Sequence, residues 1–365
     1  MSLPQVNPEL YQHQLLEKEH YLHMLFSEFA LPNIDVFQSP QQHYRMRCEF
    51  RTWHDGDELN YVMFEPGDNR HPIKITECPM VSTTIHDMMF DLLAQIAQVP
   101  ELRYRLFQID FLSTLSGELL VTLLYHRQIG DEWVAAANQL KDQFKINLIG
   151  RARKKKIVLG RDYVTECLPI GDREYRYIQT ENSFTQPNAK VCIQMIEWAL
   201  EVTSDTQRQS DLVEFYCGNG NFTLPLAQNF RRVVATEISK SSVQAARDNV
   251  RDNNINNIDV LRMPSEDLVK VLRGELTTRK VEGLSLETCD FKTVLVDPPR
   301  AGLDPDTIQQ VIGYDRILYI SCNPDTLKDN LKVICETHTI EHFALFDQFP
   351  YTHHMECGVL LNRKL

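Results

Sequence analysis

The sequence predicts two domains, an α+β domain with an antiparallel sheet over residues 1–175 and a doubly wound α/β domain over residues 176–365. Three observations support this prediction. The chain has 365 residues, and domains usually have about 100–200 residues. Its front half carries alternating strands joined as hairpins, which is typical of an antiparallel sheet. After about residue 175 apolar strands alternate with helices, which is typical of a parallel sheet.

Composition and charge limit the class of protein. The chain is 43% hydrophobic and 24% charged, as globular proteins are. Its net charge of −12 argues against a general nucleic-acid coat but is compatible with an RNA enzyme that has a local basic patch. No apolar run of about 18 residues and no secretory signal is visible, so we expect a cytoplasmic protein that does not bind membranes. The 9 cysteines include no C-x-x-C pair, so we expect reduced thiols and no zinc or iron–sulfur site.

The elements of the front domain follow from periodicity. Residues 44–53 alternate, which places Tyr44, Met46, Cys48 and Phe50 on one face and Arg45, Arg47, Glu49 and Arg51 on the other. A turn at residues 55–57 returns the chain as a partner strand over residues 59–64. A second hairpin is predicted over residues 107–112 and 118–125, and helical spacing predicts helices over residues 10–29, 83–98 and 132–145.

The elements of the second domain alternate between strand and helix. Strands are predicted over residues 212–216, 232–236, 292–296 and 316–320, with helices over residues 223–230 and 240–253. Two final strands, over residues 341–347 and 356–362, enclose the loop 348–355.

A glycine loop follows the first of these strands. Gly218 and Gly220 allow a tight turn and a close approach to a ligand, although Thr223 stands where a dinucleotide fingerprint has its last glycine. Glu237 ends the next strand, 19 residues after Gly218, where an acidic side chain can bind ribose hydroxyls. The loop and this glutamate together favour nucleoside binding over a plain strand–turn–helix.

Two further strands end in residues that can take part in chemistry. Asp297 opens a stiff D-P-P-R loop after the strand 292–296, and Cys322 follows the strand 316–320. Ligands of open α/β sheets bind at this carboxyl edge, so Cys322 is the cysteine that most resembles a nucleophile. Glu356 precedes the last strand and, taken alone, is a solvated strand end.

Several ordered motifs resemble the S-adenosylmethionine-dependent RNA uracil-C5 methyltransferases, and most closely their tRNA (uracil-54) branch. The branch assignment follows from the lack of an iron–sulfur cysteine set and of an N-terminal TRAM domain. Five motifs lie in the second half, and the front blocks 43–51 and 107–110 extend the resemblance. The five are E-N-S-F-T-Q-P-N (181–188), E-F-Y-C-G-N-G-N-F (214–222), D-P-P-R-A-G-L-D (297–304), Y-I-S-C-N-P (319–324) and Q-F-P-Y-T-H-H-M-E-C (348–357).

The resemblance implies a Rossmann-like methyltransferase domain preceded by an RNA-binding domain. It implies transfer of a methyl group from S-adenosylmethionine to C5 of the T-loop uridine, position 54, of tRNA. Cys322 would be the nucleophile and Glu356 the general base. The cofactor would contact Gln186, Tyr216, Gly218, Asn221, Glu237 and Asp297. Neither a metal ion nor an iron–sulfur cluster is implied, and we expect a monomer whose partner is the tRNA T-arm or another RNA with a similar hairpin.

RNA contacts are expected on the front domain. Arg45, Arg47 and Arg51 share a strand face and can meet phosphates. Phe107 and His126 lie at one end of the second hairpin, where their rings can stack in the space that an extruded base leaves. It is equally well supported that Phe107 packs in a core and His126 lies on a solvated edge, and the basic run 151–161 can equally be a solvated face.

Three alternatives remain open at this point. The first is the same reaction on a uridine of ribosomal RNA. The second is an RNA-remodelling protein that only holds the T-loop open, although the presence of both Cys322 and Glu356 argues against it. The third is a cytosine-C5 methyltransferase, which usually has a Pro-Cys motif on the loop where this chain has Asp297-Pro298-Pro299.

Overall fold

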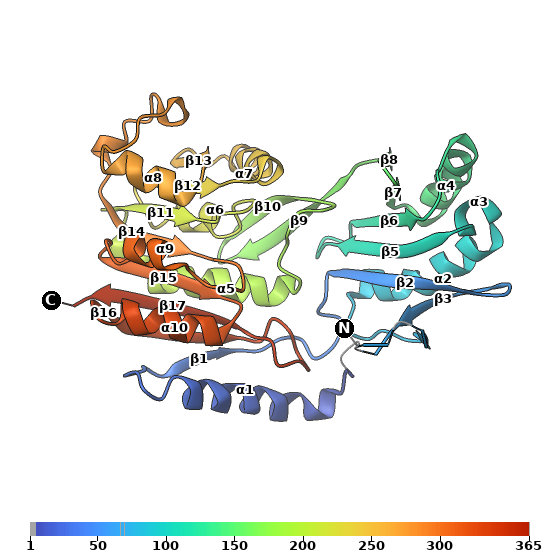
Figure 1. Ribbon diagram of the computed structural model, residues 1–365, viewed down its shortest axis with the longest axis horizontal. Coiled ribbons are helices and arrows are strands. Elements are labelled where there is room, and N and C mark those ends of the chain that lie inside the picture. Colours follow the sequence, from blue (N-terminus) through green and yellow to red (C-terminus); the bar gives the residue numbers. More distant parts are fainter. Residues whose placement is uncertain (1–4, 66, 69, 365) are drawn as a thin grey trace. The chain divides into compact units, whose positions relative to one another are not determined.

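The computed structural model describes residues 5–65, 67–68 and 70–364, which fold into two compact units (Figure 1). Of the described residues, the first unit contains 5–8, 40–167 and 178–189, and the second contains 9–39, 168–177 and 190–364. This division differs from a single boundary at residue 175, because residues 9–39 pack with the second unit. None of the described helices is long and apolar enough to cross a membrane.

The first unit is built on a seven-stranded sheet in the order β4-β3-β2-β5-β6-β7-β8. Every neighbouring pair is antiparallel except β6 and β7, which run parallel because α4 connects them. The elements are β2 (Arg47–Asp55), β3 (Glu58–Met63), β4 (Ile73–Lys74), α2 (Thr83–Gln98), α3 (Pro100–Arg103), β5 (Leu106–Ser113), β6 (Leu119–Tyr125), α4 (Asp131–Phe144), β7 (Asn147–Ala152) and β8 (Lys155–Leu159).

The predicted alternation along β2 is confirmed. Cys48 and Phe50 are buried in the core while Glu49 and Arg51 are exposed. The helix α2 covers this core with an apolar face, and its start is capped by Ser82, whose hydroxyl accepts a hydrogen bond from the backbone N–H of Ile85 at 3.3 Å. The exposed side of β2 is therefore left available to a ligand.

The second unit is an eight-stranded sheet in the order β1-β16-β17-β15-β14-β11-β12-β13. All strands are parallel except β17, which runs antiparallel between β15 and β16. The strands are β1 (Ile34–Phe37), β11 (Asp211–Phe215), β12 (Val233–Glu237), β13 (Ile258–Arg262), β14 (Phe291–Val296), β15 (Arg316–Ser321), β16 (His338–Phe346) and β17 (Glu356–Arg363). The strand order reverses between β11 and β14, which is the switch point where open α/β sheets bind ligands.

Helices cover both faces of this sheet, as a doubly wound fold requires. One face packs against α1 (Tyr11–Leu25), α8 (Ser265–Leu272), α9 (Pro305–Val311) and α10 (Pro324–Ile334). The other carries α5 (Ala189–Val202), α6 (Thr223–Leu226) and α7 (Lys240–Asp252). The helix α1 belongs here because its buried side chains join this core, where Phe26 lies 5.1 Å from Phe343 between ring centroids.

A two-stranded ribbon of β9 (Tyr163–Ile170) and β10 (Arg173–Thr180) carries the chain between the units. The predicted strands and helices are present with shifts of a few residues, except that the helix expected over residues 223–230 is only the single turn α6. The sequence patterns did not predict β1, β4, β7–β10, β13, α3, α5, α8, α9 or α10.

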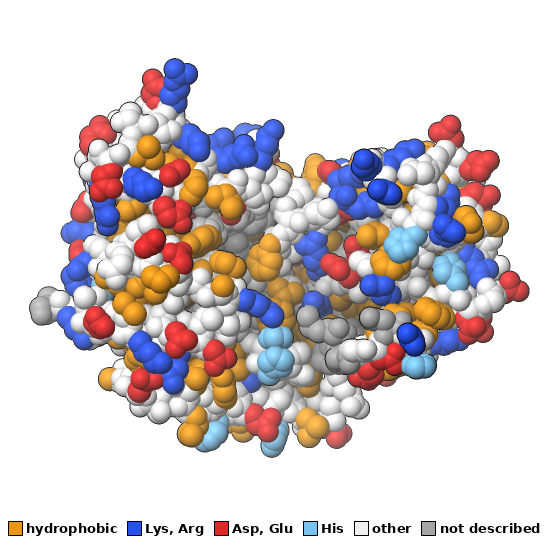
Figure 2. All heavy atoms as spheres, viewed as in Figure 1, with side chains coloured by type: hydrophobic (Ala, Val, Ile, Leu, Met, Phe, Trp, Pro, Cys, Tyr) orange, Lys and Arg blue, Asp and Glu red, His pale blue; other side chains and the backbone are white. Residues whose placement is uncertain are grey.

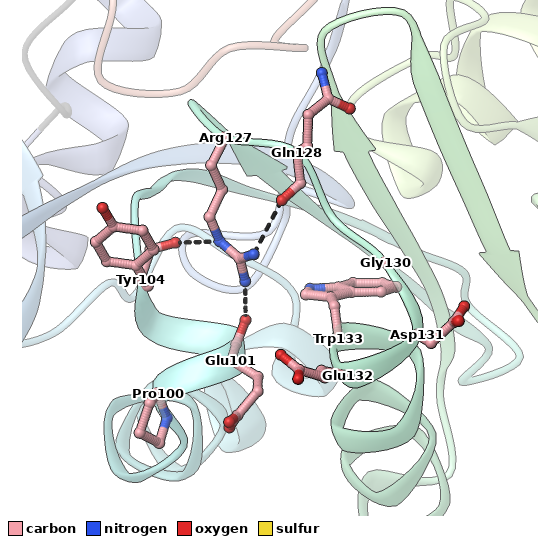
Figure 3. A pocket seen from close by; sticks show the side chains of 9 residues that line it. All are labelled: Pro100, Glu101, Tyr104, Arg127, Gln128, Gly130, Asp131, Glu132 and Trp133. Carbon is pink, nitrogen blue, oxygen red and sulfur yellow. Dashed lines mark hydrogen bonds between the residues drawn. The ribbon is translucent and has the colours of Figure 1, made fainter.

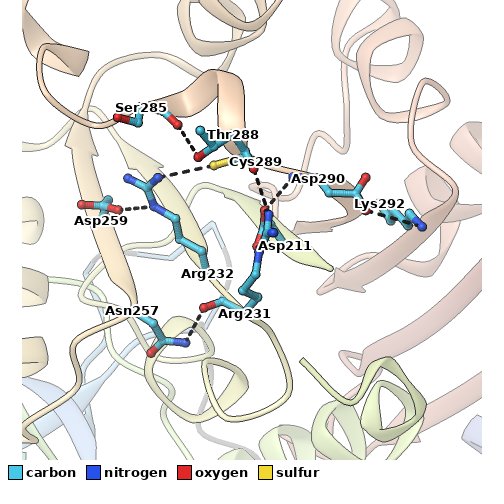
Figure 4. Close-up of polar contacts among 10 residues, drawn as sticks. All are labelled: Asp211, Arg231, Arg232, Asn257, Asp259, Ser285, Thr288, Cys289, Asp290 and Lys292. Carbon is cyan, nitrogen blue, oxygen red and sulfur yellow. Dashed lines mark hydrogen bonds and ion pairs between the residues drawn. The ribbon is translucent and has the colours of Figure 1, made fainter. Parts of the chain in front are cut away.

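Ion pairs brace the amino end of the sheet, opposite the ligand edge (Figure 4). Arg231 Nε donates to the buried Asp211 at 2.9 Å, and Arg232 Nε donates to Asp259 at 2.8 Å. These contacts tie β11, β12 and β13 together where their backbone ladder begins. We assign this cluster a structural role.

Candidate active site

The strand order brings three residues far apart in sequence to one sheet edge. In the register, Val296 of β14 lies opposite Tyr319 of β15, and Ser321 lies opposite Cys357 of β17. Asp297 and Cys322 directly follow the ends of β14 and β15. Because β17 is antiparallel, it begins at this same edge, and its first residue is Glu356. The tertiary structure thus changes Glu356 from a predicted strand end to a neighbour of Cys322.

The alternation of side chains along the strands places Asp297, Cys322 and Glu356 on the same face of the sheet. The residues Val296, Tyr319 and Cys357 belong to the core beneath α8–α10. Side chains alternate along a strand, so the next positions, Asp297 and Glu356, point to the opposite face. The electrostatic interactions agree, because Cys322 is influenced by both carboxylates and Asp297 also acts on Glu356.

The environment of Cys322 favours the protonated thiol. Burial, together with the charges of Glu356 and Asp297, raises the pKa of Cys322 to about 11, although the charge of Arg300 acts to lower it. The amino end of α10, which begins two residues after Cys322, favours a thiolate, but the pKa of Cys322 is raised nonetheless. Cys217 and Cys357 at the same edge are buried, whereas Cys322 is partly exposed.

The neighbouring acids are also shifted towards their neutral forms. Burial raises the pKa of Asp297 to about 7. Glu356 is 4% exposed, and burial together with the charge of Asp297 raises its pKa well above the ordinary value. Burial raises the pKa of Glu214 to about 8, with a further contribution from Asp297. Perturbed acids in one cluster are typical of a catalytic site.

The loop after β11 is shaped by glycine. Gly220 has φ +88°, and a Cβ atom there would lie 2.5 Å from Leu224 Cδ1. Glu237 approaches the loop as its spacing predicts, since its carboxylate accepts hydrogen bonds from the backbone N–H of Gly218 at 3.2 Å and of Ser239 at 2.7 Å. Each carboxylate oxygen retains a lone pair for another donor.

The residues around this loop fit a nucleoside cofactor. A Cβ atom on Gly218 would meet no described atom within 4 Å, so a ligand can approach the backbone there. The buried Nδ2 of Asn221 has no hydrogen-bond partner among the described residues. A cavity of about 490 Å³ opens beside Glu237 and is lined by Ile238, Arg247, Arg262, Met263, Pro264 and Lys280.

Two other predicted cofactor residues lie differently. Tyr216 follows β11 directly, with a strained φ of +63°, and packs half-buried against the sheet core. Gln186 belongs to the first unit, in the segment before α5, and its contact with a cofactor stays a prediction. Among the described residues, no three His, Cys, Asp or Glu side chains are arranged to hold a metal ion.

In the first unit, three of the predicted RNA residues form one column. The rings of Phe107 and His126 stack with centroids 4.0 Å apart and planes 24° apart. The guanidinium carbon of Arg51 lies 4.2 Å from the Phe107 centroid. The column presents an imidazole, an aromatic ring and a cation together on a partly exposed surface, which suits stacking with bases and attraction of phosphates.

The other two predicted arginines are engaged within the protein. The two Nη groups of Arg47 donate to the backbone carbonyls of Ser183 and Glu181, and burial lowers the pKa of Arg47. Arg45 Nε donates to the carbonyl of Arg47 at 2.9 Å. The Arg47 side chain fixes the segment that carries the 181–188 motif, and any phosphate contact by Arg45 or Arg47 stays a prediction.

A cavity of about 690 Å³ in this unit is lined by Tyr104, Arg127 and Trp133, among others (Figure 3). The guanidinium of Arg127, the neighbour of His126, spans its wall and donates to the carbonyls of Tyr104, at 2.8 Å, of Gln128, at 3.0 Å, and of Glu101. All of these acceptors are backbone oxygens. Arg127 therefore braces the chain that carries His126.

Three of the six cations in the basic run 151–161 are paired with carboxylates. Lys and Arg side chains gather over the β7–β8 hairpin in Figure 2. Arg151 Nη2 donates to the Glu181 carboxylate at 2.6 Å, Lys156 lies 2.8 Å from Asp162, and Arg161 lies 2.8 Å from Glu118. These three cations stabilise the first unit, which favours the structural interpretation for them.

Two residues of the site were not singled out from the sequence. Glu214 is a charged residue inside the apolar strand β11, and that exception was the available signal. Arg300 ends the D-P-P-R motif, and its carbonyl accepts a hydrogen bond from Asn323 Nδ2 at 3.0 Å. This bond ties the loop after β14 to the residue that follows Cys322.

Comparison with known proteins gives full-length similarity. A family model described as tRNA (Uracil-5-)-methyltransferase matches residues 10–364. The tRNA/tmRNA (uracil-C(5))-methyltransferase of Vibrio atlanticus is 52% identical over 371 residues, and that of Shewanella oneidensis is 53% identical over 367; each alignment covers 100% of both chains. The crystal structure of the Pyrococcus abyssi tRNA (uracil-54, C5)-methyltransferase with S-adenosyl-L-homocysteine has a similar fold, with a TM-score of 0.72 at 20% identity, and covers 96% of this chain and 82% of its own.

Proposed function

This chain belongs to the tRNA (uracil-5-)-methyltransferase family, and we propose that it methylates the uridine at position 54, in the T-loop, through a covalent adduct on Cys322. Members of this family are S-adenosylmethionine-dependent, and the donor set around Gly218, Asn221 and Glu237 fits that cofactor. The observation that supports the mechanism best is the β15–β17 register, which puts a partly exposed thiol beside a buried carboxyl group.

The first step is addition of the Cys322 sulfur to C6 of the uracil. C5 of uracil is a weak nucleophile, and addition at C6 moves the electrons of the C5–C6 double bond into an enolate that can attack through C5. The thiol of Cys322 must lose its proton as it attacks. We propose that the Asp297 carboxylate, which also influences Cys322, accepts this proton, so that Glu356 remains a free carboxylate for the last step.

The second step forms the new carbon–carbon bond. S-adenosylmethionine would supply an electrophilic methyl group, and as C5 attacks, the bond from this methyl group to the positively charged sulfur would break and leave S-adenosylhomocysteine. Glu237 and the glycine loop would hold its nucleoside, and Asp297 would lie between that loop and Cys322 along the sheet edge. C5 then carries both the methyl group and its original hydrogen.

The last step restores the double bond. Glu356 removes the hydrogen of C5, the electrons return to the C5–C6 bond, and the bond from C6 to the Cys322 sulfur breaks. A positioned base contributes about 10²–10⁴-fold to such a step. Burial raises the pKa of Glu356, so its carboxylate is a stronger base than an exposed glutamate.

The first unit would supply the RNA contacts. A uridine in a folded T-arm is stacked, and its extrusion costs a few kcal/mol. The column of Arg51, Phe107 and His126 can offset this cost, since base stacking on aromatic side chains contributes about 1–3 kcal/mol per base. The relatives' names include tmRNA, so we include other RNAs with a T-loop-like hairpin as proposed cytoplasmic substrates.

The proposal is tested with two substitutions that fail differently. Cys322→Ala removes the nucleophile, so no adduct forms and methylation is lost. Glu356→Gln leaves attack and methyl transfer possible but removes the base, so a covalent protein–RNA complex accumulates as a denaturation-resistant band that requires S-adenosylmethionine. The double variant gives no band. A band in the double variant assigns the nucleophile to another cysteine, and full turnover by Glu356→Gln shows that another group removes the proton.

The target position is tested with RNA variants. Unmodified tRNA should accept one methyl group, and tRNA in which uridine 54 is replaced by cytidine should accept none. Unmodified ribosomal RNA serves as the competing substrate, and the product nucleoside is mapped. Methylation of the substituted tRNA would show that the target is another nucleotide, and faster methylation of ribosomal RNA would show that the target lies in that RNA.

A further inference from the structure

The helix α1 carries one cation on its buried face. Tyr11, Leu15, Lys18 and Leu22 are all buried at helical spacing, and the Lys18 side chain is only 5% exposed. An ammonium group inside a core is costly unless charged or polar partners surround it. Lys18 therefore calls for a role that an apolar residue at the same position does not fill.

All three hydrogens of the Lys18 ammonium have acceptors. Its Nζ atom donates to Asp347 Oδ1 at 2.6 Å, to the carbonyl of Phe349 at 3.0 Å and to the carbonyl of His354 at 2.9 Å. Burial lowers the pKa of Lys18, and the charge of Asp347 raises it. These acceptors belong to one segment, the loop 347–355 between β16 and β17.

This loop ends at Glu356. The last pair in the β16–β17 ladder joins Phe346 to Glu356, so residues 347–355 close the ladder at the active edge. The ammonium holds Asp347, the first residue of the loop, and His354, two positions before Glu356. One buried cation thus fastens both ends of the loop.

Neighbouring contacts extend the same connection. Gln14, one turn before Lys18, donates to the other oxygen of Asp347 at 2.9 Å and accepts from the backbone N–H of Tyr351 at 3.3 Å. Within the loop, the Thr352 hydroxyl donates to the Phe349 carbonyl at 2.8 Å. The loop is therefore held by α1 at its start, middle and end.

We propose that Lys18 is a positioning residue, whose buried ammonium holds the loop 347–355 so that Glu356 is fixed beside Cys322. Stability alone does not account for the pair, because apolar residues often replace buried ion pairs with no loss of stability. A base displaced by about 1 Å can lose on the order of 10²-fold in rate, so the geometry of this loop matters to the proton-removal step. The inference rests on the proposed role of Glu356.

The test uses a double variant, Lys18→Met with Asp347→Asn. It removes both charges, so no unpaired charge is left in the core. The matched control is Lys332→Met with Asp329→Asn, which makes the same changes at an ion pair on the exposed face of α10, with the two charged atoms 3.2 Å apart. Both proteins are assayed as full chains with unmodified tRNA, and Glu356→Gln is assayed beside them.

The expected result is a loss confined to the last step. The Lys18→Met/Asp347→Asn protein should form the covalent complex at a rate within about threefold of the parent, with a similar KM for tRNA, while kcat falls about 10- to 100-fold. Its covalent complex should accumulate, as in Glu356→Gln, and should require S-adenosylmethionine. The control should turn over at the parent rate.

Other results overturn the proposal in distinguishable ways. Parent-like turnover by the Lys18→Met/Asp347→Asn protein, while Glu356→Gln still accumulates the complex, shows that Lys18 does not position the base. Lower turnover with a raised KM and no accumulated complex shows that the loop serves binding instead. If Glu356→Gln turns over fully, the proposed function fails first. Should the double variant not fold, Gln14→Leu removes two loop contacts without a charge change and is judged by the same readouts.

Discussion

Because its pKa is raised, the Cys322 thiol should react unusually slowly with alkylating reagents, and the rate of this reaction should depend steeply on pH. With a pKa of about 11, roughly one molecule in 3,000 carries the thiolate at pH 7.5, against about one in ten for an ordinary cysteine. The thiolate population is thus about 300-fold smaller. A more basic thiolate is intrinsically more nucleophilic. With a Brønsted coefficient of about 0.4–0.5, this pKa difference makes the thiolate react about tenfold faster.

Alkylation of Cys322 by iodoacetamide in the protein without RNA should therefore be about 30-fold slower than that of a free thiol at pH 7.5. The rate should keep rising from pH 6.5 to 9.5, by up to about tenfold per pH unit, because the folded pKa lies above this range. Peptide mapping by mass spectrometry separates Cys322 from the other cysteines. A plateau above pH 8 would refute the argument, because it would place the thiol pKa near its ordinary value.

The carboxylate of Glu356 contributes to the raised pKa of Cys322, so replacing Glu356 should change that pKa in a predictable direction. Its charge raises the pKa of Cys322, so Glu356→Gln should lower that pKa and speed alkylation. The difference should grow with pH, because the raised pKa of Glu356 leaves that group neutral at the acidic end. Glu336→Gln, at an exposed position after α10, is the matched control and should leave the rate unchanged.

Three further outcomes are expected. Gly220→Ala should lower the free energy of unfolding of the protein by about 2–5 kcal/mol, the sum of a left-handed backbone cost of about 1–2 and an overpacking cost of about 1–3 against Leu224. In the same denaturant titration Gly171→Ala, which has φ +54° and no described atom within 4 Å of a new Cβ, should show only the backbone cost. Glu237→Ala should weaken S-adenosylmethionine binding at least about tenfold by calorimetry, and unchanged affinity would remove Glu237 from the site. Arg51→Ala should weaken tRNA binding and reduce the slope of affinity against salt by about one, whereas Arg251→Ala, an exposed cation on α7, should keep the parent slope.

Local sequence patterns were enough to predict many of the elements and the residues that follow the strands at the carboxyl edge. Alternation along β2 identified its buried and exposed faces because side chains of a strand alternate. The 19-residue spacing from Gly218 placed Glu237 beside the glycine loop, where it now accepts the Gly218 N–H. Cys322 was predicted at the carboxyl edge because it directly follows an apolar strand, and the resemblance of ordered motifs indicated the family.

Contacts between distant segments decided the rest. Glu356 lies beside Cys322 only because β17 enters the sheet antiparallel between β15 and β16, and no local pattern specifies that insertion. For the same reason the sequence could not show that residues 9–39 belong to the second unit. In the sequence alone, Lys18 is an ordinary polar residue of a predicted helix. Only the packing of α1 beside the loop 347–355 buries its ammonium among three oxygen acceptors. Sequence periodicity reports which side of an element is buried, whereas the partner that buries it is set by the tertiary fold.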